Sequence, residues 1–432
     1  MKSAWIIVLT IAPALLGAAV VLAQSAPSPA PATRPTVLKR MAPYRMKEFI
    51  IGSWPFHSDY DENFCRRYKA AGFNTLIDSP AILDLAEKTG LKVIIHTALH
   101  PVMDKASGQF TGKFDMGGYA HLPEIQWFHK MYGKKPALIG HLVNDNCTLH
   151  DYTIEVCRWM RANCSEQIPF MSHNPDAGGQ AKVVDALPIL SSQNYPYGYH
   201  NEWSESKKRL EFCKRLEEDR RHANANDMVI WPIFAVYGGA GGDDRGHGAK
   251  PCDLSPSQIR FQAFSSLAYG AQSLWYFAYS SKRPVWKDGG SVRTAVTYCN
   301  NYIVPMVGPR VLGTRCVGVF HSKGADDAPD GSPPLAEDRI VESMDKNLLA
   351  GVLMGEEDFA AGKSTPAYVL VVDKRTVQAG QGDPPARQAS VSFGPQVRKV
   401  TILGDKARTG SVNGNLATLN LVGGDGVLLR LE

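Results

Sequence analysis

The sequence has no block of like charges, no C-x-x-C motif and only one long apolar run. Its 47 Lys+Arg and 42 Asp+Glu residues give a net charge of +5 that is spread along 432 positions. Without a basic patch, a nucleic-acid-binding protein is not indicated. The eight cysteines lack the paired spacing of a zinc framework. These absences leave a globular chain, whose 44% hydrophobic residues are enough for a large core.

The one long apolar run lies at the N-terminus, between residues 4 and 22, and follows Lys2. Small residues at Val21 and Ala23 then suit a cleavage site, so residues 1–23 are predicted to be a signal peptide. We expect a secreted or periplasmic protein with no membrane contact after cleavage; the alternative is an uncleaved anchor, which Pro13 and Gly17 would weaken. Residues 24–46 form a Pro/Ala-rich linker. In this compartment one or two disulfides could form, but the spacing indicates no pairing.

Between residues 47 and 312, short apolar runs alternate eight times with stretches of helical periodicity. Eight strand–helix units of this length predict an α/β fold, a (β/α)8 TIM barrel, whereas the alternative, an open doubly wound sheet, would need five or six. The predicted strands are 48–54, 73–78, 92–96, 137–143, 168–173, 188–194, 228–236 and 272–279. The predicted helices are 61–71, 81–89, 122–132, 149–163, 179–186, 204–223, 257–269 and 292–304.

Residues 313–432 have a different pattern, in which short alternating runs are separated by turn residues. The runs are 316–320, 348–354, 367–373, 389–393, 399–403, 416–421 and 426–431. Strands at this spacing predict a small antiparallel β-sandwich domain after the barrel.

The ends of the predicted barrel strands carry aromatic, amide, imidazole and carboxyl side chains. A TIM barrel places its site at the carboxyl ends of its strands, so these side chains should meet around one opening. Aromatic rings can stack on sugar rings while amides and imidazoles bind hydroxyl groups, so a carbohydrate is the expected substrate. The predicted substrate-binding residues are Trp54, His96, Asn144, His173, Asn194, Tyr195, Tyr237 and Trp275. The first strand has no H-x-H pair, and no metal or other cofactor is expected.

Three segments resemble those of clan A-type glycoside hydrolases. The segment His141-Leu142-Val143-Asn144-Asp145 resembles the Asn–Glu pair that closes their fourth strand, with Asp in place of Glu. The others are Asn194-Tyr195-Pro196 and the stretch from Arg260 to Phe277, which is similar to their seventh helix and eighth strand. The resemblance extends over residues 47–432 and implies a TIM-barrel glycosidase with a C-terminal β-sandwich. The departure is at strand seven, where residues 234–238 lack the nucleophilic glutamate of that clan.

Glycoside hydrolysis generally uses two carboxyl groups. The sequence indicates one candidate for the general acid and several for the second carboxylate. Asp145 is the candidate general acid; the alternative is a structural carboxylate at a helix start. The second carboxylate is expected from Asp243 or Asp244, after strand seven, with Glu202 and Asp78 as further candidates. The sequence therefore predicts a secreted glycoside hydrolase acting on a polysaccharide or oligosaccharide. The alternatives are a non-catalytic carbohydrate-binding barrel and, less favoured, a metal-dependent hydrolase; no oligomeric state is predicted.

Overall fold

The structure is a computed structural model, and it describes thirteen stretches of the chain. They are 48–55, 61–97, 99–103, 110–116, 120–145, 151–172, 187–200, 202–236, 254–279, 284–322, 328–337, 339–362 and 366–432. The predicted signal peptide, the linker up to residue 46 and the helix predicted at 179–186 lie outside them. The described residues all belong to one compact unit. No described helix is long and apolar enough to cross a membrane.

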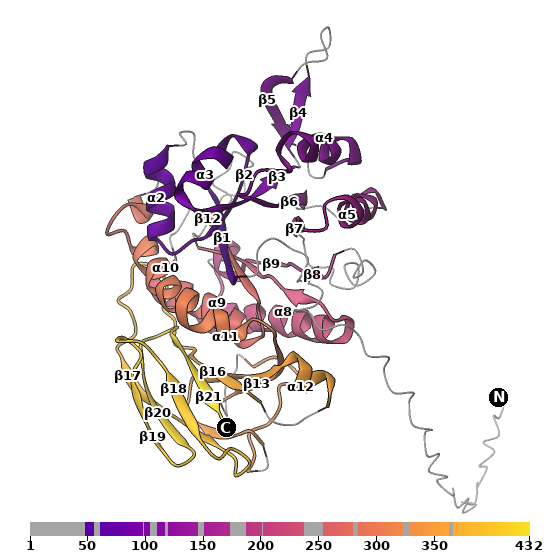
Figure 1. Cartoon of the computed structure of the whole chain (residues 1–432). Coiled ribbons are helices and arrows are strands. Elements are labelled where there is room, and N and C mark those ends of the chain that lie inside the picture. The colour runs from indigo at the N-terminus through magenta and orange to yellow at the C-terminus, as the bar shows by residue number, and fades with distance from the viewer. Residues whose placement is uncertain are drawn as a thin grey trace, which may run out of the picture. The chain divides into compact units, whose positions relative to one another are not determined.

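Eight parallel strands form the barrel sheet, in the order β7-β6-β3-β2-β1-β12-β11-β9 (Figure 1). Their bounds are β1 Ile50–Pro55, β2 Thr75–Asp78, β3 Lys92–His96, β6 Leu138–Asp145, β7 Ile168–Ser172, β9 Gln193–Asn194, β11 Ile233–Ala235 and β12 Ser273–Tyr279. Two short strands, β8 Ile189–Leu190 and β10 Val229–Ile230, pair with each other just before β9 and β11. Predicted strands six and seven are thus each interrupted, the seventh at Pro232, which has no N–H to donate. The predicted TIM barrel is confirmed.

The ring has one seam that backbone hydrogen bonds do not close. Among the described strands, no ladder joins β7 to β9. Side chains bridge them instead: Ser191 Oγ donates to the Met171 carbonyl, and Gln193 Nε2 donates to Ser172 Oγ at 2.6 Å. The two ends of the sheet are therefore held together by hydroxyl and amide groups.

Within the described residues, helices follow the strands as the sequence pattern predicts. The longer ones are α2 Glu62–Ala70, α3 Leu83–Thr89, α4 Leu122–Tyr132, α5 Asp151–Asn163, α8 Glu205–Asn226, α9 Pro256–Ala268 and α10 Ser291–Tyr302. Short ones are η1 Pro80–Ile82, α7 Pro196–Tyr199, η2 Pro284–Trp286, η3 Ile303–Val307, α11 Gly308–Val311 and α12 Glu356–Ala360. A hairpin of β4 Leu99–Met103 and β5 Phe110–Met116 follows β3 and was not predicted.

The C-terminal part is the predicted β-sandwich, with antiparallel sheets in the orders β13-β15-β16-β21-β18 and β14-β17-β20-β19 (Figure 1). The strands are β13 Thr314–His321, β14 Val341–Met344, β15 Leu348–Gly355, β16 Tyr368–Asp373, β17 Arg387–Phe393, β18 Val400–Leu403, β19 Gly410–Asn413, β20 Leu416–Leu421 and β21 Gly426–Leu431. All seven predicted strands are present, and β14 and β19 are additional. All four residues of β19 are exposed, so it has no apolar alternation to detect.

Alternation along the barrel strands decides which side chains can reach the site. Ile94 of β3 belongs to the cluster inside the ring, whereas Val93 and Ile95 pack in the outer layer against the helices. Because successive side chains point to opposite faces, His96 lies on the same face as Ile94. By the same alternation, Trp275 and Phe277 of β12 lie inside the ring, while Tyr276 packs in the outer layer.

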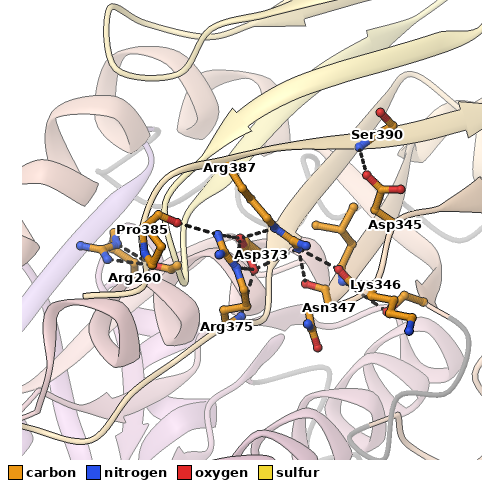
Figure 2. A network of polar contacts seen from close by, with 12 residues as sticks. Arg260, Asp345, Lys346, Asn347, Asp373, Arg375, Pro385, Arg387 and Ser390 are labelled. Atoms are coloured by element: carbon orange, nitrogen blue, oxygen red, sulfur yellow. Dashed lines mark hydrogen bonds and ion pairs between the residues drawn. The ribbon is translucent and has the colours of Figure 1, made fainter. Parts of the chain in front are cut away.

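Charged side chains connect barrel helices to sandwich loops. Arg260 of α9 donates twice to the Gly423 carbonyl, at 2.9 and 2.7 Å, and pairs with Asp383 at 3.0 Å. Figure 2 shows the neighbouring network, in which the buried Asp373 at the end of β16 accepts hydrogen bonds from Arg375 and Arg387. We keep residue 313 as the proposed start of the sandwich domain.

Candidate active site at the barrel mouth

Asp145 and His96 meet at the carboxyl ends of two adjacent strands. Asp145 is the last residue of β6 and His96 the last of β3, and Nε2 of His96 lies 3.2 Å from Oδ2 of Asp145. The Asp145 side chain is 21% exposed. A carboxyl group that is partly shielded, held at one oxygen and still open to solvent is suited to transferring a proton to a bound molecule.

Two further polar residues extend this arc around the ring. Ser172 ends β7 and is the register partner of Asp145 on β6. Gln193 begins β9 in register with Ile233 of β11, whose side chain lies inside the ring. Gln193 therefore points inward, and its amide nitrogen donates to Ser172 Oγ. His96, Asp145, Ser172 and Gln193 form what we call the polar arc, which runs over four neighbouring strands.

Aromatic rings occupy other strand ends. Tyr195, which follows β9, stacks on Phe277 of β12 with 5.6 Å between ring centroids and 24° between planes. Trp54 of β1 meets the same Phe277 ring edge-on at 6.0 Å. Tyr195 and Phe277 are both partly exposed, whereas Trp54 is buried. These three residues form what we call the aromatic arc, in which Phe277 contacts both of the others.

Five residues of the predicted substrate-binding set are buried, namely Trp54, His96, Asn144, Asn194 and Trp275. Trp275 is fully buried inside the ring, where it stacks on Phe170 at 4.9 Å. Asn194 points outward, and its amide nitrogen donates to the Phe212 carbonyl of α8 at 2.9 Å. Asn144 is also fully buried. The expectation that Trp275 and Asn194 face a substrate is thus corrected: Trp275 lies one layer too deep, and Asn194 lies on the wrong face of its strand.

The sequence reasoning missed two residues that occupy the corresponding places at the mouth. Phe277 stands two residues after Trp275, one layer nearer the opening, and Gln193 stands one residue before Asn194 on the opposite face. Counting inward positions from the strand ends would have identified both, because alternation has a period of two.

β11, which corresponds to the predicted seventh barrel strand, has a small side chain at the position where the resemblance to glycosidases predicts a nucleophile. Ala235 ends β11 in register with Phe277 of β12, and it is buried. The predicted partners Asp243 and Asp244 lie outside the described residues, as do His173 and Tyr237.

Two other candidate carboxylates have different surroundings. Glu202 is 67% exposed and pairs with His200 Nδ1 at 3.1 Å. Its own backbone N–H, followed by His200, lowers the pKa of this carboxyl, which favours the ionised form that a base or nucleophile needs. Asp78 ends β2, and its Oδ1 accepts a hydrogen bond from Ser79 N at 2.6 Å, at the start of η1. Within the described residues, no group of three or more His, Cys, Asp or Glu side chains could hold a metal ion.

Comparison with known proteins bears on the fold of this mouth. The sequence matches no family model and no curated protein. A crystal structure of a glycoside hydrolase family 5 protein from Bacteroides vulgatus ATCC 8482 is similar to this chain, with a TM-score of 0.54 and 10% identity over 89% of each chain. In fold, this chain is like a glycoside hydrolase.

Two further solved structures agree with this glycosidase-like barrel and sandwich. One, described as a glycoside hydrolase, has a TM-score of 0.51 and 12% identity, covering 89% of this chain and 92% of its own. The other is alpha-L-fucosidase isoenzyme 2 from Paenibacillus thiaminolyticus, with a TM-score of 0.50 and 9% identity, covering 90% of this chain and 100% of its own. At these identities the likeness shows a shared fold, and it confirms the fold-level resemblance to glycosidases.

Proposed function

We propose that the protein is an exported glycoside hydrolase that cleaves a polysaccharide or oligosaccharide, with Asp145 as general acid. The observation that carries the proposal is the placement of Asp145, at a strand end and hydrogen-bonded to His96, in a barrel of glycosidase-like fold. The mixed lining of the mouth also supports it. A sugar ring could lie on the aromatic arc while its hydroxyl groups bind the polar arc.

We assign His96 the role of orienting the acid. Nε2 of His96 lies 3.2 Å from Oδ2 of Asp145, so an imidazole that carries its proton on Nε2 would donate to the carboxyl group and orient its acidic proton. That proton would pass to the glycosidic oxygen as its bond to the sugar breaks, leaving Asp145 as a carboxylate. His96, which the sequence predicts as a substrate-binding residue, would therefore act on the substrate through Asp145.

The second carboxyl group of this mechanism is proposed to be Asp243 or Asp244, in the segment that follows β11. Because Ala235 fills the inward position at the end of that strand, the partner acid would have to reach the mouth from further along the chain. A separation from Asp145 of about 5–5.5 Å would give retention of anomeric configuration, and about 6.5–9.5 Å would give inversion.

The test is hydrolysis by Asp145→Asn on a panel of oligosaccharides, with product release measured by chromatography. Losing the general acid should lower kcat about 10²–10⁴-fold while leaving oligosaccharide binding largely intact. The matched control is Asp84→Asn, the same change at an 81% exposed carboxylate on an outer helix, which should retain activity. Undiminished hydrolysis by Asp145→Asn would refute the assignment. Wild-type protein that binds oligosaccharides without cleaving them would support the non-catalytic binding barrel.

A further inference from the structure

The connection between β9 and α8 carries a cluster of side chains that the proposed mechanism does not use. His200 and Trp203 stack on each other, with 3.6 Å between ring centroids and 2° between planes. Nδ1 of His200 lies 3.1 Å from Oε1 of Glu202, and Nζ of Lys207 lies 4.2 Å from the centroid of the Trp203 ring. Because the imidazole covers one face of the indole, the ammonium group lies over the other face.

The start of α8 does not require this cluster. Ser204 is the N-cap residue of the helix, and its side chain accepts a hydrogen bond from Lys207 N at 3.2 Å. This cap already satisfies a backbone N–H of the first turn. Trp203 precedes the cap and is partly exposed, while the His200 and Glu202 side chains are 41% and 67% exposed. These three side chains are therefore accessible to a ligand.

The cluster lies at the same end of the barrel as Asp145. It follows β9, and the connections that follow the strands lie at the carboxyl end of the sheet. Between Tyr195 and His200 the chain forms only α7, Pro196–Tyr199. A helical rise of about 1.5 Å per residue places His200 about 8 Å from Tyr195 along the helix axis. A sugar chain with one unit on Tyr195, in the aromatic arc, could therefore place a neighbouring unit at His200.

The groups that this cluster presents suit a sugar unit. One face of the His200 ring can pack on the C–H face of a sugar, since Trp203 covers only the other face. Nε2 of His200 makes no hydrogen bond within the part of the chain that the structure describes, so it is open to a hydroxyl group. The backbone N–H of Glu202 and then His200 lower the pKa of the Glu202 carboxyl. The ionised carboxylate accepts strong hydrogen bonds from hydroxyl groups.

We propose that His200, Glu202 and Trp203 form an outer subsite that binds a further sugar unit of the chain held at the barrel mouth. His200 and Glu202 contact the sugar, and Trp203 is a positioning residue that supports the imidazole from behind. The inference rests on the proposed function in that it takes the ligand to be a carbohydrate. It adds that the protein selects an oligosaccharide long enough to reach from Tyr195 to His200.

The experiment is calorimetric titration of the full chain carrying Asp145→Asn, so that binding is measured without hydrolysis. The probes are the disaccharides and hexasaccharides of the cello-, xylo-, manno- and malto-oligosaccharide series. Adding His200→Ala should weaken binding of the best-bound hexasaccharide about 5–10-fold, the size of one hydrogen bond and one ring contact, and change disaccharide binding less than about twofold. Adding Glu202→Gln should weaken hexasaccharide binding about threefold, because an amide makes weaker hydrogen bonds than a carboxylate.

His222→Ala is the matched control. It makes the same change in a partly exposed histidine of α8, about 25 Å along the helix from Glu205 at its start. This variant should bind the disaccharide and the hexasaccharide as the parent protein does.

The possible results separate this subsite from the proposed hydrolase. A loss of hexasaccharide affinity in His200→Ala, with disaccharide affinity retained and His222→Ala unchanged, supports the subsite. Unchanged hexasaccharide affinity in His200→Ala overturns it, even where the wild type hydrolyses the sugar. An equal loss for both lengths also overturns it, because the effect would then lie at the mouth. Absence of binding to every probe overturns both proposals. If His200→Ala fails to fold, the Glu202→Gln titration decides.

Discussion

Replacing Arg408 by methionine should destabilise the whole compact unit, because this buried cation connects the sandwich to the barrel. Its side chain is 0% exposed, and its guanidinium lies 4.2 Å from the ring centroids of both Tyr298 and Tyr302 of α10. Nε donates to Asp425 Oδ1 at 3.0 Å, and Nη1 donates to Asp405 Oδ2 at 2.8 Å.

The magnitude of the destabilisation follows from the buried carboxylate that Arg408→Met leaves without its cation. Asp425 would be a buried carboxylate without its cation, and removing one partner of a buried pair costs about 3–5 kcal/mol. Asp425 keeps hydrogen bonds from the Tyr298 hydroxyl at 2.7 Å and from Gly426 N at 2.9 Å. We therefore expect the lower end of that range, about 3 kcal/mol. The double variant with Asp425→Asn should recover most of the loss, because a neutral amide needs no counter-charge.

The loss should also depend on pH in a defined direction. Burial raises the pKa of the Asp425 carboxyl above its ordinary 3.8 even though Arg408 lowers it. Without Arg408 the pKa rises further, so the folded variant prefers the protonated acid. The destabilisation should be smallest below about pH 3, where the acid is protonated in both the folded and the unfolded state, and should grow as the pH rises through the unfolded-state pKa of about 3.9.

Urea unfolding of wild type and variant at pH 4.5 and 7.5, followed by tryptophan fluorescence, measures this difference. Arg430→Met is the control, since that side chain is 46% exposed and its loss should shift the midpoint little. An Arg408→Met variant as stable as the wild type at pH 7.5, or a loss that is larger at acid pH, would refute the reasoning.

Three further outcomes are expected. Burial raises the pKa of Asp219 to about 6, so the stability of the folded protein should fall as the pH rises from about 4 to 6. The variant Asp219→Asn should remove that fall, and should raise the urea midpoint at pH 7.5 but not at pH 4. Gly52→Ala would place a Cβ 2.2 Å from the Trp275 ring and should cost about 1–3 kcal/mol or more, whereas Gly382→Ala should be neutral in the same unfolding assay. Phe277→Ala should raise KM for oligosaccharides more than it lowers kcat, as measured by initial rates, if its ring is a binding surface of the proposed hydrolase.

The barrel could be predicted from the sequence because its strands are almost continuously apolar and its helices are periodic. The β3 prediction at 92–96 matches the structure, since Val93, Ile94 and Ile95 are buried on both faces of the sheet. The β4–β5 hairpin and β19 escaped prediction. For β19 the reason is direct, because all four of its residues are exposed and it lacks the required alternation.

The site was predicted less completely than the fold, because it depends on the layer of the barrel and the face of the sheet that each side chain occupies. Trp275 and Asn194 stand in the predicted strands, but one residue more or less along β9 reverses the face, and two along β12 change the layer. The contact between His96 and Asp145 joins residues 49 positions apart, and no local pattern reports it. His96 and Asp145 could each be predicted as a site residue, because each stands at the end of a predicted barrel strand. That they contact one another could not be predicted.

The six cysteines in the described residues are all buried. Burial raises the pKa of Cys157, Cys299 and Cys316 to about 12, so at pH 7 only about one thiol in 10⁵ at each is ionised. Attack on an oxidant or an alkylating reagent requires the ionised sulfur, so these three thiols should stay unmodified by either in the folded protein. Unfolding removes that protection at every one of these positions together, and iodoacetamide labelling would therefore report loss of the native state.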